Sequence, residues 1–187
     1  MKRFISIALC LLIACVCFSG CKDSKKNESA GSVDVEYYAK IGEMPECEYS
    51  LGADAEQIKE KAEKHFNESE EAYYSLEEGE KSILIDTGDF KYYYEKEKAD
   101  KGVSLIVNNN TAYGFSLGTV SVEIENALSK FNSEKVTDLE DDLFFIISPT
   151  GNIEGRKYIF GDNAVIFVFS DNALIATAIY SLENWTI

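Results

Sequence analysis

Residues 49–66 (YSLGADAEQIKEKAEKHF) decide how this sequence is organised, because a turn phrase leads directly into an amphipathic segment. The phrase Tyr-Ser-Leu-Gly comes first, and apolar residues then recur at every fourth position from Ile58 to Phe66, the spacing of one helix face. Asp54 and Gln57 have the spacing of a capping box at the start of a helix. The stretch therefore predicts an amphipathic helix introduced by a tight turn.

A second stretch, residues 115–131 (FSLGTVSVEIENALSKF), has the same layout. It opens with Phe-Ser-Leu-Gly and continues into apolar residues at helical spacing, namely Val120, Ile124, Ala127, Leu128 and Phe131. Ile58 and Lys64 of the first stretch occupy the same positions as Ile124 and Lys130 of the second. We interpret this agreement as a tandem duplication, and the alternative is chance recurrence of a short motif.

Strand-like runs follow each predicted helix. After the first helix they are residues 82–86, 90–96 and 103–107, and after the second they are residues 143–147, 156–160, 164–169 and 174–180. Tight-turn signals at residues 161–163 (GDN) and 170–172 (SDN) separate the last runs, which favours an antiparallel meander. We therefore predict an α+β fold, a tandem repeat of a helix packed on an antiparallel meander sheet, with the first repeat at 34–110 and the second at 111–187.

A short alternating run opens the first repeat. Val35, Tyr37 and Ala39 alternate with polar neighbours, which is the period of a strand. Met44-Pro45 then interrupts the run. A short strand, or a lead-in segment, is predicted there.

The N-terminus has the layout of an export signal. Lys2 and Arg3 precede an apolar run over residues 4–18, and small residues follow. The run is shorter than the roughly 20 residues that a membrane-spanning helix needs. Residues 18–21 (FSGC) resemble the lipobox of bacterial lipoproteins. This resemblance implies cleavage after residue 20, acylation of the Cys21 sulfur with chains such as palmitate, and anchorage to the outer face of the cell membrane. Ordinary secretion is the alternative.

The domain boundaries follow from these features. Residues 1–20 form the predicted lipoprotein signal peptide. Residues 21–33 are the predicted flexible stem, because residues 22–33 (KDSKKNESAGSV) are polar, small and without periodicity. The stem would hold the folded part of the chain clear of the lipid headgroups.

The charge balance narrows the classes of partner. The chain has 33 acidic and 18 basic side chains, a formal net charge of −15. Such a charge repels phosphate backbones, so we predict no nucleic-acid binding. The acid excess is typical of a soluble exported surface, and attraction to basic partners or divalent cations is the alternative reading.

The sequence carries little material for catalysis. Beyond Cys21 only Cys47 remains as a cysteine, and His65 is the single histidine. We interpret Cys47 as a small apolar residue and His65 as a packed or half-buried helix side chain. Residues 138–142 (DLEDD) form the tightest acidic cluster but lack the spacing and central glycine of a calcium loop. We predict no enzyme activity, no cofactor and no metal site.

Tyrosines on and beside one strand are the candidate binding residues. Alternation over residues 90–94 places Tyr92 and Tyr94 on one face of the strand and Tyr93 on the other. One face must pack under the helix, so we expect Tyr93 on the open face. An exposed tyrosine there would offer a partner both contact area and a hydroxyl group. The full candidate set, with two tyrosines that precede the strands, is Tyr73, Tyr74, Tyr92, Tyr93 and Tyr94.

The run at 164–169 is apolar on both faces. A sheet with one wet face should alternate apolar and polar residues. Something must therefore cover its second face, and the candidates are the other repeat, a dimer mate or a partner protein.

The turn phrase, the helix and the antiparallel sheet, found twice in an exported lipoprotein, resemble the SmpA/BamE and β-lactamase-inhibitor-protein group over residues 49–180. This resemblance implies binding or assembly work rather than chemistry. We expect a lipid-anchored extracytoplasmic lipoprotein that acts as a non-enzymatic module binding a protein or envelope component. The alternative is a surface receptor for a small ligand or cation.

Overall fold

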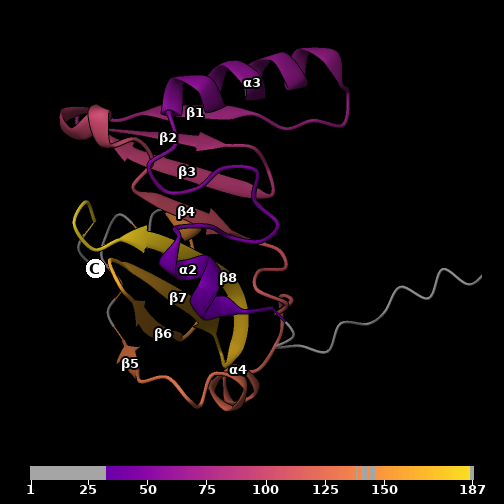
Figure 1. Ribbon diagram of the computed structural model, residues 1–187. Coiled ribbons are helices and arrows are strands. Elements are labelled where there is room, and N and C mark those ends of the chain that lie inside the picture. The colour runs from indigo at the N-terminus through magenta and orange to yellow at the C-terminus, as the bar shows by residue number, and fades with distance from the viewer. Residues whose placement is uncertain (1–32, 138, 140–142, 144–145, 186–187) are drawn as a thin grey trace, which may run out of the picture.

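The computed structural model describes residues 33–137, 139, 143 and 146–185. The predicted signal peptide, Cys21 and all but the last residue of the predicted stem lie outside this part of the chain. Eight described strands form one antiparallel sheet in the order β1-β2-β3-β4-β8-β7-β6-β5 (Figure 1). Their bounds are β1 Ser75–Glu78, β2 Ser82–Asp86, β3 Phe90–Glu95, β4 Leu105–Asn108, β5 Ser133–Val136, β6 Ile153–Phe160, β7 Asn163–Ser170 and β8 Ala173–Ser181.

The described helices are short apart from one. Their bounds are α2 Val35–Lys40, α3 Ala55–Glu68, the 3-10 helix η1 Lys96–Lys101 and α4 Ser121–Ala127. In Figure 1, α3 lies beside β1 and β2 at one end of the sheet, while α2 lies in front of the other half. The structure confirms an α+β fold built on an antiparallel sheet.

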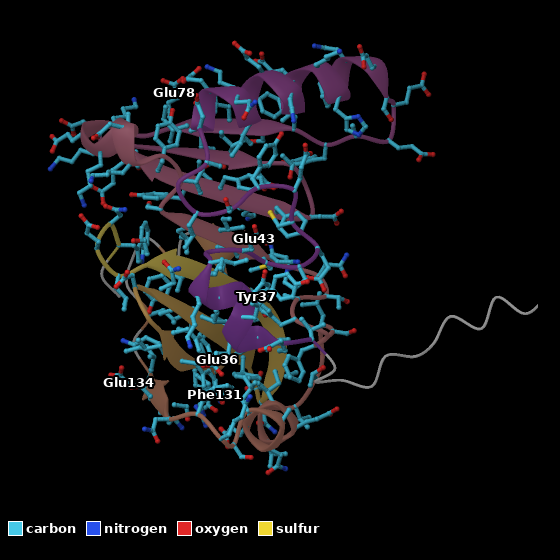
Figure 2. The ribbon with its side chains drawn as sticks, in the orientation of Figure 1. Glu36, Tyr37, Glu43, Glu78, Phe131 and Glu134 are labelled. Carbon is cyan, nitrogen blue, oxygen red and sulfur yellow. The ribbon has the colours of Figure 1, made fainter. Side chains whose placement is uncertain are left out.

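The two halves of the sheet meet at its centre. The first four strands follow α3 and are neighbours in chain order, and the last four follow α4. The last strand, β8, pairs with β4 in a register that sets Leu105 opposite Tyr180 and Asn108 opposite Thr177. Figure 2 labels Glu78 and Glu134, which mark the two outer edges of the sheet, formed by β1 and β5.

The turn phrase makes the same three hydrogen bonds in both halves. In the first half the amide of Ala53 donates to the Ser50 carbonyl at 3.1 Å, and the amide of Gly52 donates to the Val103 carbonyl at 2.8 Å. The amide of Val103 donates back to the Ala53 carbonyl at 3.0 Å. These bonds form a tight turn and tie it to the residues before β4. Gly52 has a φ of +80°, which is why the phrase ends in glycine.

The second copy of the phrase is bonded in the same way. The amide of Thr119 donates to the Ser116 carbonyl at 3.1 Å, and that of Gly118 to the Leu174 carbonyl at 2.8 Å. The amide of Leu174 donates back to the Thr119 carbonyl at 2.9 Å. Each phrase therefore joins the segment before a helix to the chain near the start of the last strand of its half, just before β4 in the first half and within β8 in the second.

Helix α3 begins and ends close to its predicted limits. The Asp54 carboxylate accepts from the amides of Glu56 and Gln57, so the predicted N-terminal cap is confirmed. Ile58 is buried, but Phe66 is 48% exposed, so the helix packs on the sheet at its start and extends beyond it at its end. Helix α4 is shorter than predicted and ends at Ala127.

One face of the sheet, the helix face, packs against α2, α3 and α4. Its core combines strand and helix side chains, including Ile58, Ile124, Tyr92, Phe167 and Ile179. Edge-to-face aromatic contacts run through it, such as the ring pair Phe115 and Phe167 at 5.6 Å. This is the face that the sequence predicted to lie under the helices.

The opposite face, the far face, is also buried. Leu139, Leu143 and Ile146, from the connection between β5 and β6, pack against it. Trp185 near the C-terminus covers Tyr93, with ring centroids 4.5 Å apart at an angle of 90°. The second face is therefore covered by this chain's own connecting segments. From the sequence we expected the other repeat, a dimer mate or a partner protein as the cover, but not these segments.

Two predicted strands are wrong. Residues 35–39 are helical because Asp34 caps the turn and Val35 and Ala39, four residues apart, are both buried on one side. Residues 143, 146 and 147 also have helical backbone, so the strand predicted at 143–147 is wrong. The structure adds the edge strands β1 and β5, which were missed because edge strands carry polar residues.

Candidate functional site

The structure removes three of the candidate tyrosines from the surface. Tyr92 and Tyr94 are buried in the helix face, as alternation predicted, and Tyr93 is 8% exposed beneath Trp185 on the far face. The expectation that Tyr93 stands on an open face is wrong, because this chain's own segments cover that face. Tyr92, Tyr93 and Tyr94 serve the core here.

The remaining tyrosine candidates lie together at one end of the sheet. Tyr73 is 54% exposed, and Tyr74 is half-buried with its ring 6.5 Å from that of Phe66. Cys21 and most of the acidic cluster 138–142 lie outside the described residues. Leu139, the described member of that cluster, is buried in the far face.

A groove beside α3, the α3 groove, has a volume of about 480 Å³. One side of α3 forms one wall, the loop before α3 forms the second, and the α3–β1 loop and the β2–β3 turn close the rest. Its lining residues are Glu46, Glu48, Tyr49, Ile58, Lys61, Ala62, His65, Glu71, Ala72, Tyr73, Thr87, Gly88, Asp89, Phe90 and Tyr92. The volume falls in the range of ordinary small-molecule sites.

Aromatic rings line the α3 groove. The ring of Tyr49 meets that of Tyr92 edge to face, with centroids 5.7 Å apart, and Phe90 lies 6.3 Å from Tyr92. Tyr73 adds an exposed ring. The buried Tyr92 thus packs against the two inner rings, while the Tyr73 ring is exposed to an occupant of the groove.

The charges of the α3 groove are mainly acidic. Glu46, Glu48, Glu71 and Asp89 line it, against one lysine, Lys61. The Lys61 ammonium lies 2.9 Å from the Glu48 carboxylate and 5.3 Å from the centroid of the Tyr49 ring. The hydrogen bond to Glu48 raises the pKa of Lys61, so this ammonium stays charged.

Cys47 lies close to the α3 groove without lining it. Its Sγ is 3.3 Å from the hydroxyl oxygen of Tyr92, within hydrogen-bonding distance. Burial raises the pKa of the Cys47 thiol and that of the Tyr92 hydroxyl, so both groups stay protonated at neutral pH. A protonated thiol is a poor nucleophile, and among the described residues no hydrogen bond joins Cys47 to His65.

His65 is exposed on α3, where it lines the α3 groove. The prediction that it is packed or half-buried is wrong, because this part of α3 extends past the core. Within the part of the chain that the structure covers, no three side chains of His, Cys, Asp or Glu lie together in a way that could hold a metal ion. The groups present suit non-covalent binding.

The acidic residues that line the α3 groove were not predicted from the sequence. Glu46, Glu71 and Asp89 come from three separate loops, and each looked like an ordinary solvated charge. The turn signal at residues 87–89 (TGD) was readable, but the partner of that turn across the groove was not. Only the packing of α3 on β2 and β3 brings these loops together.

Comparisons with known proteins leave the site to be interpreted from its own geometry. No protein-family model, no curated protein and no solved structure matches this chain. Among the described residues, no helix has the length and apolar character needed to cross a membrane.

Proposed function

We propose that this protein is a lipid-anchored extracytoplasmic binding protein without catalytic activity, and that it holds a small ligand in the α3 groove. The groove itself carries this proposal: a hollow of about 480 Å³, walled by fixed aromatic rings and a few charged groups. Binding sites for small molecules typically combine these two elements. The chemistry around Cys47 and His65 supplies no activated nucleophile.

A small ligand fits the geometry better than a protein bound to the sheet. The tyrosines that would have formed a contact surface on the sheet are buried, and both faces of the sheet are covered. The α3 groove is the concave feature that remains open beside Tyr73.

A filled groove tests this proposal. Ala62 is half-buried on α3 and lines the groove, so Ala62→Trp would place an indole in the space of the ligand. The matched control is Ala127→Trp, an exposed alanine at the end of α4. We expect compounds from a metabolite collection to raise the melting temperature of the wild type and of the control but not of Ala62→Trp. A collection in which every hit stabilises Ala62→Trp equally would contradict the proposal.

The anchor is the second part of the proposal. It rests on the signal-like N-terminus and on the resemblance of residues 18–21 to a lipobox. In a bacterial host fed labelled palmitate, the wild-type chain should carry label and sediment with membranes, whereas Cys21→Ala should do neither. A labelled, membrane-bound Cys21→Ala protein would refute lipidation at this cysteine.

We also propose that the two halves of the chain arose by duplication, as in the group that the sequence resembles. The shared bonding of the two turn phrases supports this idea, since Gly52 and Gly118 donate to similar points near the start of the last strand of each half. The mirrored strand order supports it too. Relatives in which the two halves are recognisably similar in sequence would test it.

Protein binding remains the second candidate function. Leu117, Val120 and Val122 are exposed apolar residues close together before and within α4. Val122→Lys, compared with Glu123→Lys next to it, would show whether a membrane protein captured by chemical cross-linking depends on this patch. Equal capture by both variants would argue against the patch.

A further inference from the structure

We infer that the α3 groove selects an organic cation carrying an ammonium group. This inference rests on the proposed function and names its ligand class. It is argued from three features of the groove: a resident ammonium, acidic side chains without a basic partner, and aromatic rings.

Lys61 shows that the groove wall already accommodates an ammonium group. Its Nζ is held by the Glu48 carboxylate at 2.9 Å and lies over the Tyr49 ring at 5.3 Å. An ammonium facing both a carboxylate and an aromatic ring is the usual arrangement for cation recognition. Further carboxylates and aromatic rings line the rest of the groove.

The other acidic groups of the groove lack a basic partner. Glu46, Glu71 and Asp89 line it, and none of them lies within salt-bridge distance of a lysine, arginine or histidine in the described chain. A cation would be attracted by these carboxylates, and an anion would be repelled. The overall net charge of −15 has the same effect on approach.

The acidic groups favour an organic cation over a metal ion. They sit on separate loops, and within the described residues no three potential ligands converge on one point. Between them lie the rings of Tyr49, Phe90 and Tyr73, which offer apolar contact and cation–π attraction to an amine with a carbon body. The apolar contact would not help to bind a bare metal ion.

Three probes of the same size separate these possibilities: benzylamine, benzyl alcohol and benzoate. The full chain in nonionic detergent is titrated with each probe, and amide chemical shifts are followed by NMR. We expect benzylamine to shift the amides of Lys61 and Asp89 and to bind about tenfold more tightly than benzyl alcohol. Benzoate should cause no saturable shift.

Paired variants test the role of charge at the groove itself. Glu46→Gln, Glu71→Gln and Asp89→Asn, combined, should abolish the preference for benzylamine over benzyl alcohol. The matched control removes three exposed acids that lie outside the groove and outside any described salt bridge, namely Glu80→Gln, Glu97→Gln and Glu123→Gln. This control changes the net charge by the same amount as the groove variant. It should keep the preference for benzylamine, because its three acids lie outside the groove.

Lys61→Gln gives a test with the opposite sign. Removing the resident ammonium frees Glu48 and Tyr49, so benzylamine should bind more tightly, by several-fold. Lys64→Gln, one turn away and outside the groove, is the control and should leave affinity unchanged. Weaker benzylamine binding in Lys61→Gln would overturn the inference.

The outcomes distinguish the inference from the function beneath it. Equal binding of benzylamine and benzyl alcohol at the groove would overturn the ammonium preference and leave a small-ligand site in place. Saturable binding of benzoate alone would overturn the preference in the same way. If no probe shifts the groove amides and no compound distinguishes Ala62→Trp, both the inference and the proposed function fail.

Discussion

Replacing Gly102 by alanine should loosen the attachment of α3 and lower the stability of the whole chain. Gly102 has φ 68° and ψ −154°, a backbone region that is essentially restricted to glycine. A Cβ there would lie 2.5 Å from the Ala53 carbonyl oxygen and closer still to that of Gly52. Both contacts are with backbone, so no flexible side chain can move aside.

The cost follows from two contributions. Holding alanine in this backbone region costs about 1–3 kcal/mol. The added Cβ would also push the segment with Gly52 and Ala53 away from Val103. This movement would weaken the hydrogen bonds that join Gly52 and Ala53 to Val103, each worth about 1 kcal/mol net. We therefore expect a loss of about 3–5 kcal/mol, which is a large share of the stability of a typical domain.

Urea unfolding, followed by the fluorescence of Trp185, measures this loss. The control is Gly161→Ala, because Gly161 also has a positive φ, 67°, but its Cβ would meet nothing within 4 Å. The control should lose only about 1–2 kcal/mol from backbone strain. A Gly102→Ala protein as stable as Gly161→Ala would refute the steric reasoning.

Three further predictions concern the core, an ion pair and the thiol. Tyr93→Ala should lower the free energy of unfolding by about 3–5 kcal/mol, because the Tyr93 side chain is buried. Tyr73→Ala, at an exposed position, should change it by less than about 0.5 kcal/mol. Similar losses for the two variants in urea unfolding would contradict the assigned burial. The hydrogen bond from Lys135 lowers the pKa of Glu154 in the folded state. The stability that this ion pair contributes is therefore complete above the ordinary Glu pKa of 4.5, and it is lost as the pH falls through the lower folded pKa. Lys135→Gln should flatten this acid dependence in unfolding experiments from pH 6 downwards, and an unchanged slope would count against the pair. At pH 8, Cys47 should react with iodoacetamide more slowly in the folded chain than in urea, because burial raises the pKa of its thiol. Mass spectrometry of the peptide that contains Cys47 measures the two rates. Equal rates would show that the thiol is open to solvent in the folded chain.

The central strands and the main helix were predictable because local signals there agree with the tertiary structure. The apolar runs at 164–169 and 174–180 become β7 and β8, and Asp54 caps α3 as its spacing indicated. The turn signal at 161–163 joins β6 to β7 and that at 170–172 joins β7 to β8, with Asp171 and Asn172 both at positive φ. Here the pattern and the packing require the same conformation.

The failures occur where distant contacts decide the conformation. Alternation at residues 35–39 suggested a strand, but a carboxylate cap and two buried residues four apart favour one turn and a half of helix. Leu143, Ile146 and Ile147 pack on the far face, and apolar character alone does not distinguish such a covering segment from a strand. The edge strands β1 and β5 need no apolar alternation and gave no signal.

The candidate site was predictable only in part. Tyr73 was singled out from sequence and lines the α3 groove, and Tyr92 was singled out and forms part of its inner wall. The acids on the loops around them were unremarkable one by one. Alternation assigned the tyrosines of β3 to the correct opposite faces, but it could not show that a later segment and Trp185 cover the second face.

The position of β8 has a consequence for the order of assembly. Among the described strands it comes last in sequence, yet it lies in the middle of the sheet between β4 and β7. When a chain emerges N-terminus first, the edge of β4 stays unpaired until residues 173–181 have emerged, and Trp185 follows them. A nascent chain of this protein therefore forms the β4–β8 pairing after the other seven described strands have emerged. A truncation ahead of residue 173 would leave two separate sheets, each with an open edge that could pair with another molecule.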